Sequence, residues 1–320
     1  MTSAAPVPTT ATSNPLLTSV MAAMHDIAPL SLADASWDNV GLLLESPTPP
    51  SSTSATAAPQ SAAAPGHEAN GVMLGIDLTT QVCDEIVSTH NQGQPRIGVA
   101  VIYHPLIFRG LKSITYNDPQ QASILRLLQH GVSLYCPHTS LDAAAGGIND
   151  WLAVVVSHDS MPDLGGQEGH RILTTGNWQP IVPSKEKDTN GQSGAGMGRL
   201  VTLDREITFE QAVDRVKANL QLDHVQGCPS GKAIKTIGVC AGSGSSVFRG
   251  VKADLLLTGE LSHHEVLAYK AAGTSVIVTN HTNTERKYLR DVLQHRLRDR
   301  LPKDATVLIS KMDQDPLHTF

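Results

Sequence analysis

The sequence predicts an α/β protein with mainly parallel or mixed sheets covered by helices, arranged as two similar lobes. Three observations support this fold class. Short apolar runs recur along the chain, segments of helical period lie between them, and an approximate internal repeat relates the two halves. Because most runs are apolar throughout rather than alternating, the strands are expected to be buried on both faces.

The apolar runs end at Gly, Pro, His or Asp, as strands commonly do. They predict strands over residues 72–76, 97–103, 132–136, 199–203, 234–240, 253–258 and 274–279.

Helices are predicted between these strands. Residues 15–28 place their apolar side chains on one broad face, and Thr208 with Gln211 forms a capping box ahead of an amphipathic segment. A last long helix is predicted over 282–301, with leucines at every fourth position from Leu289 facing the core. Its arginines are expected on a solvated face, because acidic residues alternate with them.

The internal repeat suggests how the chain divides. A strand near Gly75 or Gly238 is followed by a polar turn, a helix, a second buried strand and a histidine, His104 or His263. We therefore expect the following parts: a disordered N-terminus (1–14), a first lobe (15–160) with a disordered Ser/Ala/Pro-rich insertion (46–70), a connecting segment (161–195) and a second lobe (196–320). A return of the C-terminal segment to the first lobe is left open.

Charge and composition exclude several classes of protein. The net charge is −6, and the first 95 residues contain eight acidic side chains but no Lys or Arg. Because such a chain lacks a basic surface, direct nucleic-acid binding is not expected. The longest apolar runs are far shorter than the ~20 residues that a membrane helix needs. We expect a cytoplasmic protein, with nuclear or mitochondrial placement left open because no targeting signal is clear.

Four cysteines, Cys83, Cys136, Cys228 and Cys240, lie far apart without a CxxC pair. Neither a disulfide framework nor a zinc knuckle is predicted, and a reducing compartment fits best.

The most informative feature is the set of His, Asp and Glu residues that follow four predicted strands. In open parallel sheets, binding groups collect at the carboxyl ends of the strands, so these side chains are expected to converge. Imidazole and carboxylate groups are ligands of zinc, iron and manganese, so the pattern predicts a site for one or two divalent cations. The predicted ligands are His104, Asp142, His281 and Glu285.

Asp142 is the preferred candidate to bridge two cations, because it lies on a loop. Two cations ~3.5–4 Å apart would suit hydrolysis by activated water. Each ligand also has a simpler interpretation. The histidines could be hydrogen-bonded loop residues, Asp142 could cap the helix that follows it, and Thr282 with Glu285 forms a T-x-x-E capping box. Convergence of all four residues on one chemistry favours the metal.

Further polar residues lie close to these ligands in sequence. They are Glu260, His263, His264 and His138, and they are candidate acid–base groups or residues that orient the ligands. Hydrogen bonds that merely stabilise the loops are the alternative.

Five motifs in order resemble those of the Nif-three-like family, whose bacterial members are often labelled GTP cyclohydrolase type two. They are WDNVGLLLE (37–45), YHPLIF (103–108), HTSLDAAAGGINDWLA (138–153), TGELSHHEVL (258–267) and HTNTER (281–286). The resemblance runs from about Pro15 to the C-terminal DQDPLHTF.

The resemblance implies two α/β lobes flanking a metal cleft, a dinuclear centre and a ring-like homohexamer. Carried over by motif, its ligands are the same four residues. Tyr103 departs from the pattern, since many bacterial members have histidine there. Either one ion is weakly held or absent, or Tyr103 ligates in place of imidazole.

Two main functions remain open. One is a metal-dependent hydrolase acting on a nucleotide or pterin-like ring, where the cyclohydrolase label rests on the resemblance. The other is a non-catalytic interaction protein, such as a co-regulator adaptor, that a metal stabilises. Metal storage or delivery is a third hypothesis.

Overall fold

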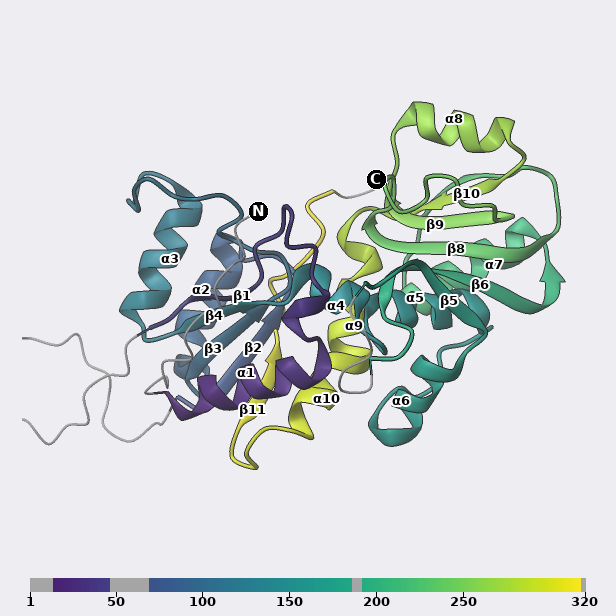
Figure 1. The fold of residues 1–320 in the computed structure, drawn as a ribbon. Coiled ribbons are helices and arrows are strands. Elements are labelled where there is room, and N and C mark those ends of the chain that lie inside the picture. The colour runs from purple at the N-terminus through teal and green to yellow at the C-terminus, as the bar shows by residue number, and fades with distance from the viewer. Residues whose placement is uncertain (1–13, 47–68, 186–191, 318–320) are drawn as a thin grey trace, which may run out of the picture.

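The computed structural model describes residues 14–46, 69–185 and 192–317. Almost all of the predicted insertion at 46–70, and the predicted disordered N-terminus up to residue 13, lie outside the described residues. Two separate sheets, each covered by helices, make up the described fold (Figure 1). The predicted α/β class is thereby confirmed.

The first sheet has the strand order β1-β4-β3-β2-β11. All its neighbours run parallel except β1, which is antiparallel to β4. The strands are β1 (Gly41–Leu44), β4 (Ser133–Cys136), β3 (Ile97–Ile102), β2 (Gly71–Gly75) and β11 (Thr306–Ile309). The last strand, β11, thus joins the sheet that the N-terminal half of the chain builds.

Helices on both faces explain why these strands are apolar throughout. Val72 and Leu74 of β2 pack into the same core as α1 (Pro15–Ile27), whereas Met73 between them packs with α2 (Thr80–Ser88). α3 (Pro119–Gln129) lies beside α2. Since successive side chains on a strand point to opposite faces, both faces need apolar residues.

The second sheet has the order β5-β6-β8-β9-β10-β7 and is mixed. Only β8, β9 and β10 are parallel to one another, and the outer strands are antiparallel. The strands are β5 (Trp178–Pro183), β6 (Gly196–Ile207), β8 (Ile234–Ser243), β9 (Leu255–Glu260), β10 (Ser275–Val278) and β7 (Gln226–Cys228). In Figure 1, α8 (His263–Ala271) covers one face, and α5 (Ile148–Ser157) and α7 (Phe209–Leu220) lie on the other. The predicted capping box of Thr208 and Gln211 is present at the start of α7.

Helix α5 links the two lobes. Its residues from Ile148 to Val156 are buried, and it contacts β6 and β8 of the second sheet although it precedes them in the chain. One apolar core runs from α1 through α5 to β8. α4 (His138–Ala143) precedes α5, and α6 (Gly166–Thr175) follows it. The domain boundaries at residues 160 and 195 stay a prediction.

The last helical segment differs in part from the prediction. It consists of the 3-10 turn η3 (Thr282–Thr284), α9 (Arg286–Tyr288), the π-helical segment η4 (Leu289–Leu293) and α10 (Gln294–Arg298). Leu289, Leu293, Leu297 and Leu301 are buried as predicted. The predicted solvated arginine face is wrong for Arg296, which is buried and donates to the carbonyl of Gly146 at 3.1 Å.

In the part of the chain that the structure describes, no helix is long and apolar enough to cross a membrane.

Candidate metal centre

Three of the four predicted ligands lie together where the two sheets meet. His104 follows β3 of the first sheet, whereas His281 and Glu285 follow β10 of the second. Nε2 of His104 lies 3.6 Å from Oε2 of Glu285, and Nε2 of His281 lies 3.6 Å from its Oε1. One ligand atom from each residue lies within 4.8 Å of the other two. We call His104, His281 and Glu285 the triad.

A second carboxylate orients each histidine of the triad. Nδ1 of His104 lies 2.9 Å from Oδ1 of Asp77, and Nδ1 of His281 lies 3.1 Å from Oε2 of Glu260. In each neutral imidazole, a proton held on Nδ1 by the carboxylate leaves the Nε2 lone pair free toward Glu285. Histidines that bind metals in proteins commonly have this arrangement.

These pairs also reveal the internal repeat. β2, α2 and β3 carry Asp77 after the first strand and His104 after the second, while β9, α8 and β10 carry Glu260 and His281 in the same order. The predicted match of His104 to His263 is therefore wrong. His263 begins α8, and no helix lies between β8 and β9.

Glu285 is a buried carboxylate, and one of its two oxygens has no hydrogen-bond donor among the described residues. Its side chain is 1% exposed, and Oε2 has no hydrogen-bond partner among the described residues. Burial, followed by the nearby charges of Asp142 and Asp77, raises the pKa of Glu285 well above its usual value. A buried charge is costly unless an opposite charge compensates it, so a divalent cation fits this position.

The predicted capping alternative for Glu285 is wrong. The helical turn begins with His281 rather than Thr282 as the capping residue, and neither η3 nor α9 has a side-chain cap hydrogen bond. The carboxylate instead faces the two histidines.

Two glycines allow the backbone to approach the triad. A Cβ on Gly242 would lie 2.7 Å from Nε2 of His281 and 2.9 Å from Oε1 of Glu285, and a Cβ on Gly259 would lie 2.7 Å from the Cα of His281. Gly242 also has a φ of +59°, which favours glycine. Because Gly242 and Gly259 have no side chains, the space beside the ligand atoms of His281 and Glu285 stays unfilled.

Asp142, the fourth predicted ligand, lies outside the triad. It is on α4, is 6% exposed, and its Oδ1 accepts a 2.6 Å hydrogen bond from the hydroxyl of Tyr103. Burial, together with the charges of Asp142 and Glu285, raises the pKa of Tyr103 well above its usual value. Tyr103 therefore stays protonated and donates a hydrogen bond to Asp142.

His138 lies beside the triad and is paired with an aspartate of its own. Its Nδ1 is 2.7 Å from Oδ1 of Asp38, and its ring lies 5.4 Å from those of His104 and Tyr103 and 5.8 Å from that of Trp37. His138 has a φ of +32°, which is rare for a residue with a side chain. It is thus placed close to the triad without belonging to it.

The remaining predicted residues are more exposed. Glu260 is in contact with His281, and its side chain is 55% exposed. His263 and His264 begin α8, are exposed, and their rings lie 5.5 Å apart. A role for these two histidines stays a prediction.

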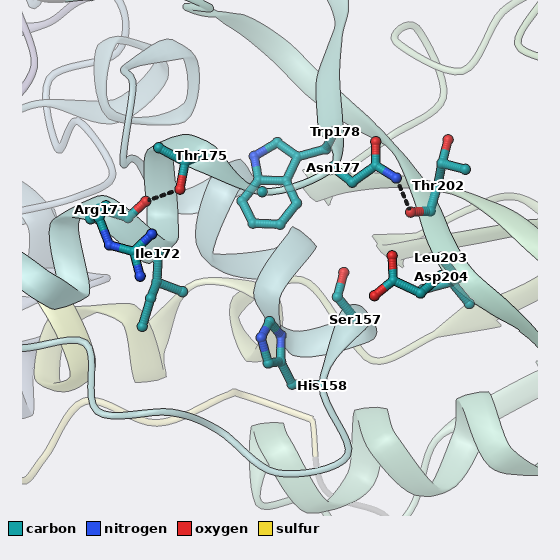
Figure 2. Close-up of a pocket in the computed structure, with 11 residues that line it drawn as sticks. Ser157, His158, Arg171, Ile172, Thr175, Asn177, Trp178, Thr202, Leu203 and Asp204 are labelled. Carbon is teal, nitrogen blue, oxygen red and sulfur yellow. Dashed lines mark hydrogen bonds between the residues drawn. The ribbon is translucent and has the colours of Figure 1, made fainter.

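A cavity of about 390 Å³ lies among α5, α6, β5 and β6 (Figure 2). Trp178, His158 and Asp204 are among its lining residues, and none of the sequence-predicted site residues is. The cavity is therefore separate from the triad.

Sequence analysis did not single out Asp77 or Asp38, and it did not place Gly242 beside the predicted ligands. Asp77 could have been found, because it follows a buried strand as His104 does. Gly242 becomes informative only when its neighbours across the sheet are known.

Two helix-covered sheets whose strand ends bring two histidines and a buried glutamate together define a class: two-sheet α/β proteins with a candidate cation site where the lobes meet. The family model described as Duf34/NIF3 (NGG1p interacting factor 3) matches residues 15–316. The chain belongs to this family, which confirms the resemblance predicted from the five motifs.

Relatives and solved structures agree with this assignment. The protein NIF3 homolog of Schizosaccharomyces pombe is 42% identical over 295 residues, covering 90% of this chain and 92% of its own. NGG1-interacting factor 3 of Saccharomyces cerevisiae is 38% identical over 302 residues, with the same coverage of 90% and 92%. A crystal structure of a Bacillus cereus protein related to NIF3 has a TM-score of 0.68 at 17% identity, covering 95% of this chain and 98% of that one, and it supports the fold alone.

Proposed function

We propose that the chain binds one divalent cation, zinc, iron or manganese, through His104, His281 and Glu285, and that it is a metal-dependent hydrolase. The observation that supports this proposal is the convergence of two carboxylate-oriented imidazoles on the buried carboxylate of Glu285, whose Oε2 has no hydrogen-bond partner among the described residues. When bound, the ion supplies a Lewis acid that lowers the pKa of water.

The residues of the chain favour a catalytic over a structural site. Three protein ligands of mixed His and carboxylate type leave a coordination position open, whereas closed structural zinc sites have four, mostly thiolate, ligands. Asp77 and Glu260 hold the Nδ1 protons and thereby fix both rings. His138, oriented by Asp38, is a candidate to exchange a proton with the substrate.

One ion rather than two is proposed because Tyr103 engages Asp142. In a dinuclear site Asp142 would bridge, but one of its oxygens accepts the Tyr103 hydroxyl. A protonated phenol is a poor ligand, so Tyr103 does not supply a donor for a second ion, and the Tyr103 hydrogen bond occupies one acceptor site of Asp142.

The hydrolase proposal is tested by turnover. Zinc-, manganese- and iron-loaded protein should be assayed on a panel of nucleotides, GTP included, and on generic phosphoester and amide substrates. We expect at least one substrate to be hydrolysed, with a rate roughly 100-fold lower for Glu285→Gln, which keeps the shape of the side chain. Equal rates in both proteins on all substrates, or no turnover above that of metal-free protein, would overturn the proposal.

A second candidate function is partner binding, since the Saccharomyces cerevisiae relative is named an NGG1-interacting factor. Trp37 and Phe108 offer a surface for a partner. Both side chains are exposed, their ring centroids lie 6.0 Å apart, and Trp37 lies beside His138. A second copy of the chain could also bind this surface, since the resemblance implies a homohexamer. Mass measurement by light scattering, comparing wild type with a Trp37→Ser/Phe108→Ser variant, distinguishes self-association from binding of another protein.

Gly242→Ala is expected to weaken cation binding at least about tenfold, because the added methyl group overlaps the ligand atoms of His281 and Glu285. Isothermal titration with Zn²⁺ measures the effect. Gly250→Ala is the matched control, since Gly250 has a similar φ of +78° but no atom within 4 Å of the added Cβ. Gly250→Ala should lose stability, as Gly242→Ala does, but keep the cation affinity of wild type. An equal loss of affinity in both variants would assign the effect to backbone strain.

A further inference from the structure

The triad is assembled from two sheets, so its geometry depends on how the two strand ends are held together. His104 comes from the first sheet, and the other two ligands come from the second. Figure 1 shows the C-terminal segment leaving β11 in the first sheet and passing toward the second. We call residues 310–317 the C-terminal strap.

The strap is fastened first to the sheet that carries His104. The backbone N–H of Ser310 donates to Leu74 at 2.8 Å, and Glu85 of α2 accepts the N–H of Lys311 at 3.0 Å. Oδ2 of Asp313 then accepts the N–H of Ile76 at 2.9 Å. Ile76 directly precedes Asp77, which orients His104.

The same strap reaches the segment that carries the other two ligands. Oδ2 of Asp313 lies 3.3 Å from Nε of Arg286, the residue after Glu285. Two residues further along, Oδ2 of Asp315 accepts a 2.9 Å hydrogen bond from the hydroxyl of Thr282, the residue after His281. Arg286 also donates to that hydroxyl at 2.5 Å, which joins the two contacts.

Asp313 therefore contacts both halves of the site through one oxygen. Its Oδ2 accepts the N–H of Ile76 and faces the guanidinium of Arg286. Its side chain is 1% exposed, and its other oxygen, Oδ1, has no hydrogen-bond partner among the described residues. Buried ion pairs add little net stability, because desolvation offsets the attraction, but a displaced partner leaves a buried charge uncompensated. Such a pair resists relative movement of the two elements that it joins.

We propose that Asp313 is a positioning residue that fixes the distance between His104 and the His281–Glu285 pair, so that high-affinity cation binding requires the C-terminal strap. This inference rests on the proposed cation site and adds its structural control. Asp313 acts through Asp77 on one side and through Arg286 on the other. Asp315 reinforces the second contact.

The test is Zn²⁺ affinity, measured by competition with a chromophoric chelator, for the full chain and its variants. We expect Asp313→Ala to weaken binding about tenfold or more, the size of effect seen when groups that orient metal ligands are removed. Asp313→Asn can still accept the N–H of Ile76 but loses the charge that faces Arg286. Its Zn²⁺ affinity should therefore lie between those of wild type and Asp313→Ala. Asp315→Asn changes a less buried position, and its Zn²⁺ affinity should fall a few-fold. This variant tests the proposal even if Asp313→Ala does not fold.

Asp254→Asn is the matched control. Asp254 also accepts backbone N–H groups, those of Lys235 at 3.0 Å and Thr236 at 2.8 Å, but it precedes β9, at the end opposite Glu260. It should lose stability without losing Zn²⁺ affinity. The visible absorption of Co²⁺-loaded protein should change in Asp313→Ala and not in the control, since it reports the coordination geometry.

The outcomes separate the inference from the proposed function. Wild type that binds Zn²⁺ while Asp313→Ala and Asp315→Asn bind it equally well would overturn the role of the strap and leave the triad intact. Wild type that binds no Zn²⁺ would overturn both. Losses in the strap variants that match the loss in Asp254→Asn would reduce Asp313 to a stabilising contact.

Discussion

Glu285→Ala is expected to lose its divalent cation, with an affinity at least roughly 100-fold below that of wild type. Glu285 faces both histidines of the triad, and its Oε2 has no hydrogen-bond partner among the described residues, so its removal leaves only the two imidazoles of the triad. Elemental analysis after dialysis and Zn²⁺ titration measure the loss. Thermal unfolding measures it independently, because a cation that binds only the folded state raises stability by mass action.

Glu285→Gln separates ligation from packing in the same experiment. In metal-free protein it should be at least as stable as wild type, since it replaces a buried charge by a neutral amide. The raised pKa of Glu285 means that the folded state holds this proton more tightly than the unfolded state. The free energy of unfolding of metal-free wild type should therefore fall as the pH rises above the ordinary range of glutamate, and the variant should lose part of that slope. Glu206→Ala, an exposed control on β6, should behave as wild type. Full Zn²⁺ binding by Glu285→Ala would show that the triad is not the cation site.

Asp150→Ala is expected to cause the largest loss of stability, about 3–5 kcal/mol, because it leaves a buried guanidinium unpaired. Asp150 of α5 forms a short ion pair with Arg199 of β6, whose side chain is 1% exposed. It also accepts from the indole of Trp178 at 2.8 Å and from the N–H of Gly146 at 2.6 Å. Urea denaturation, followed by circular dichroism, measures the change in the free energy of unfolding.

The surface pair of Glu168 and Arg171 provides the comparison. Both side chains are more than 60% exposed, so Glu168→Ala should leave the urea midpoint unchanged. If Asp150→Ala changed the midpoint as little as Glu168→Ala does, the buried pair would not be what joins α5 to the second sheet.

The interior strands could be predicted from the sequence, whereas the edge strands could not. Strands such as β3 and β9 are covered on both faces and are therefore apolar throughout. β1, β5, β7 and β11 lie at the sheet edges and are at most partly buried. β5 and β7 lack a continuous apolar run, whereas GLLL of β1 and TVLI of β11 are apolar runs of only four residues. Their strand character comes from pairing with distant segments.

The positions of the ligands were predictable for a related reason. Because carboxyl ends of parallel strands meet at one edge of a sheet, the residues that follow β3 and β10 are candidate ligands on the strength of the strand pattern alone. What the sequence could not indicate is how the two sheets face each other. That arrangement places Asp142 against Tyr103 rather than in the triad, and it makes Gly242 a neighbour of His281.

The same limit applies to Arg296 and Asp313. Charged residues usually lie at the surface, so sequence analysis placed the arginines of the last helix in solvent. Arg296 is instead buried against a carbonyl of a loop 150 residues away, and Asp313 is buried between two lobes. Burial of a charge depends on a partner that is distant in sequence.

The central claim is that the triad holds one divalent cation, and anomalous X-ray diffraction from crystals of Zn²⁺-loaded protein tests it most directly. We expect one anomalous peak per chain, about 2.0–2.2 Å from Nε2 of His104, Nε2 of His281 and an oxygen of Glu285. Elemental analysis of the same sample should give one zinc per chain. A chain without a peak at the triad, or with two ions bridged by Asp142, would contradict this account.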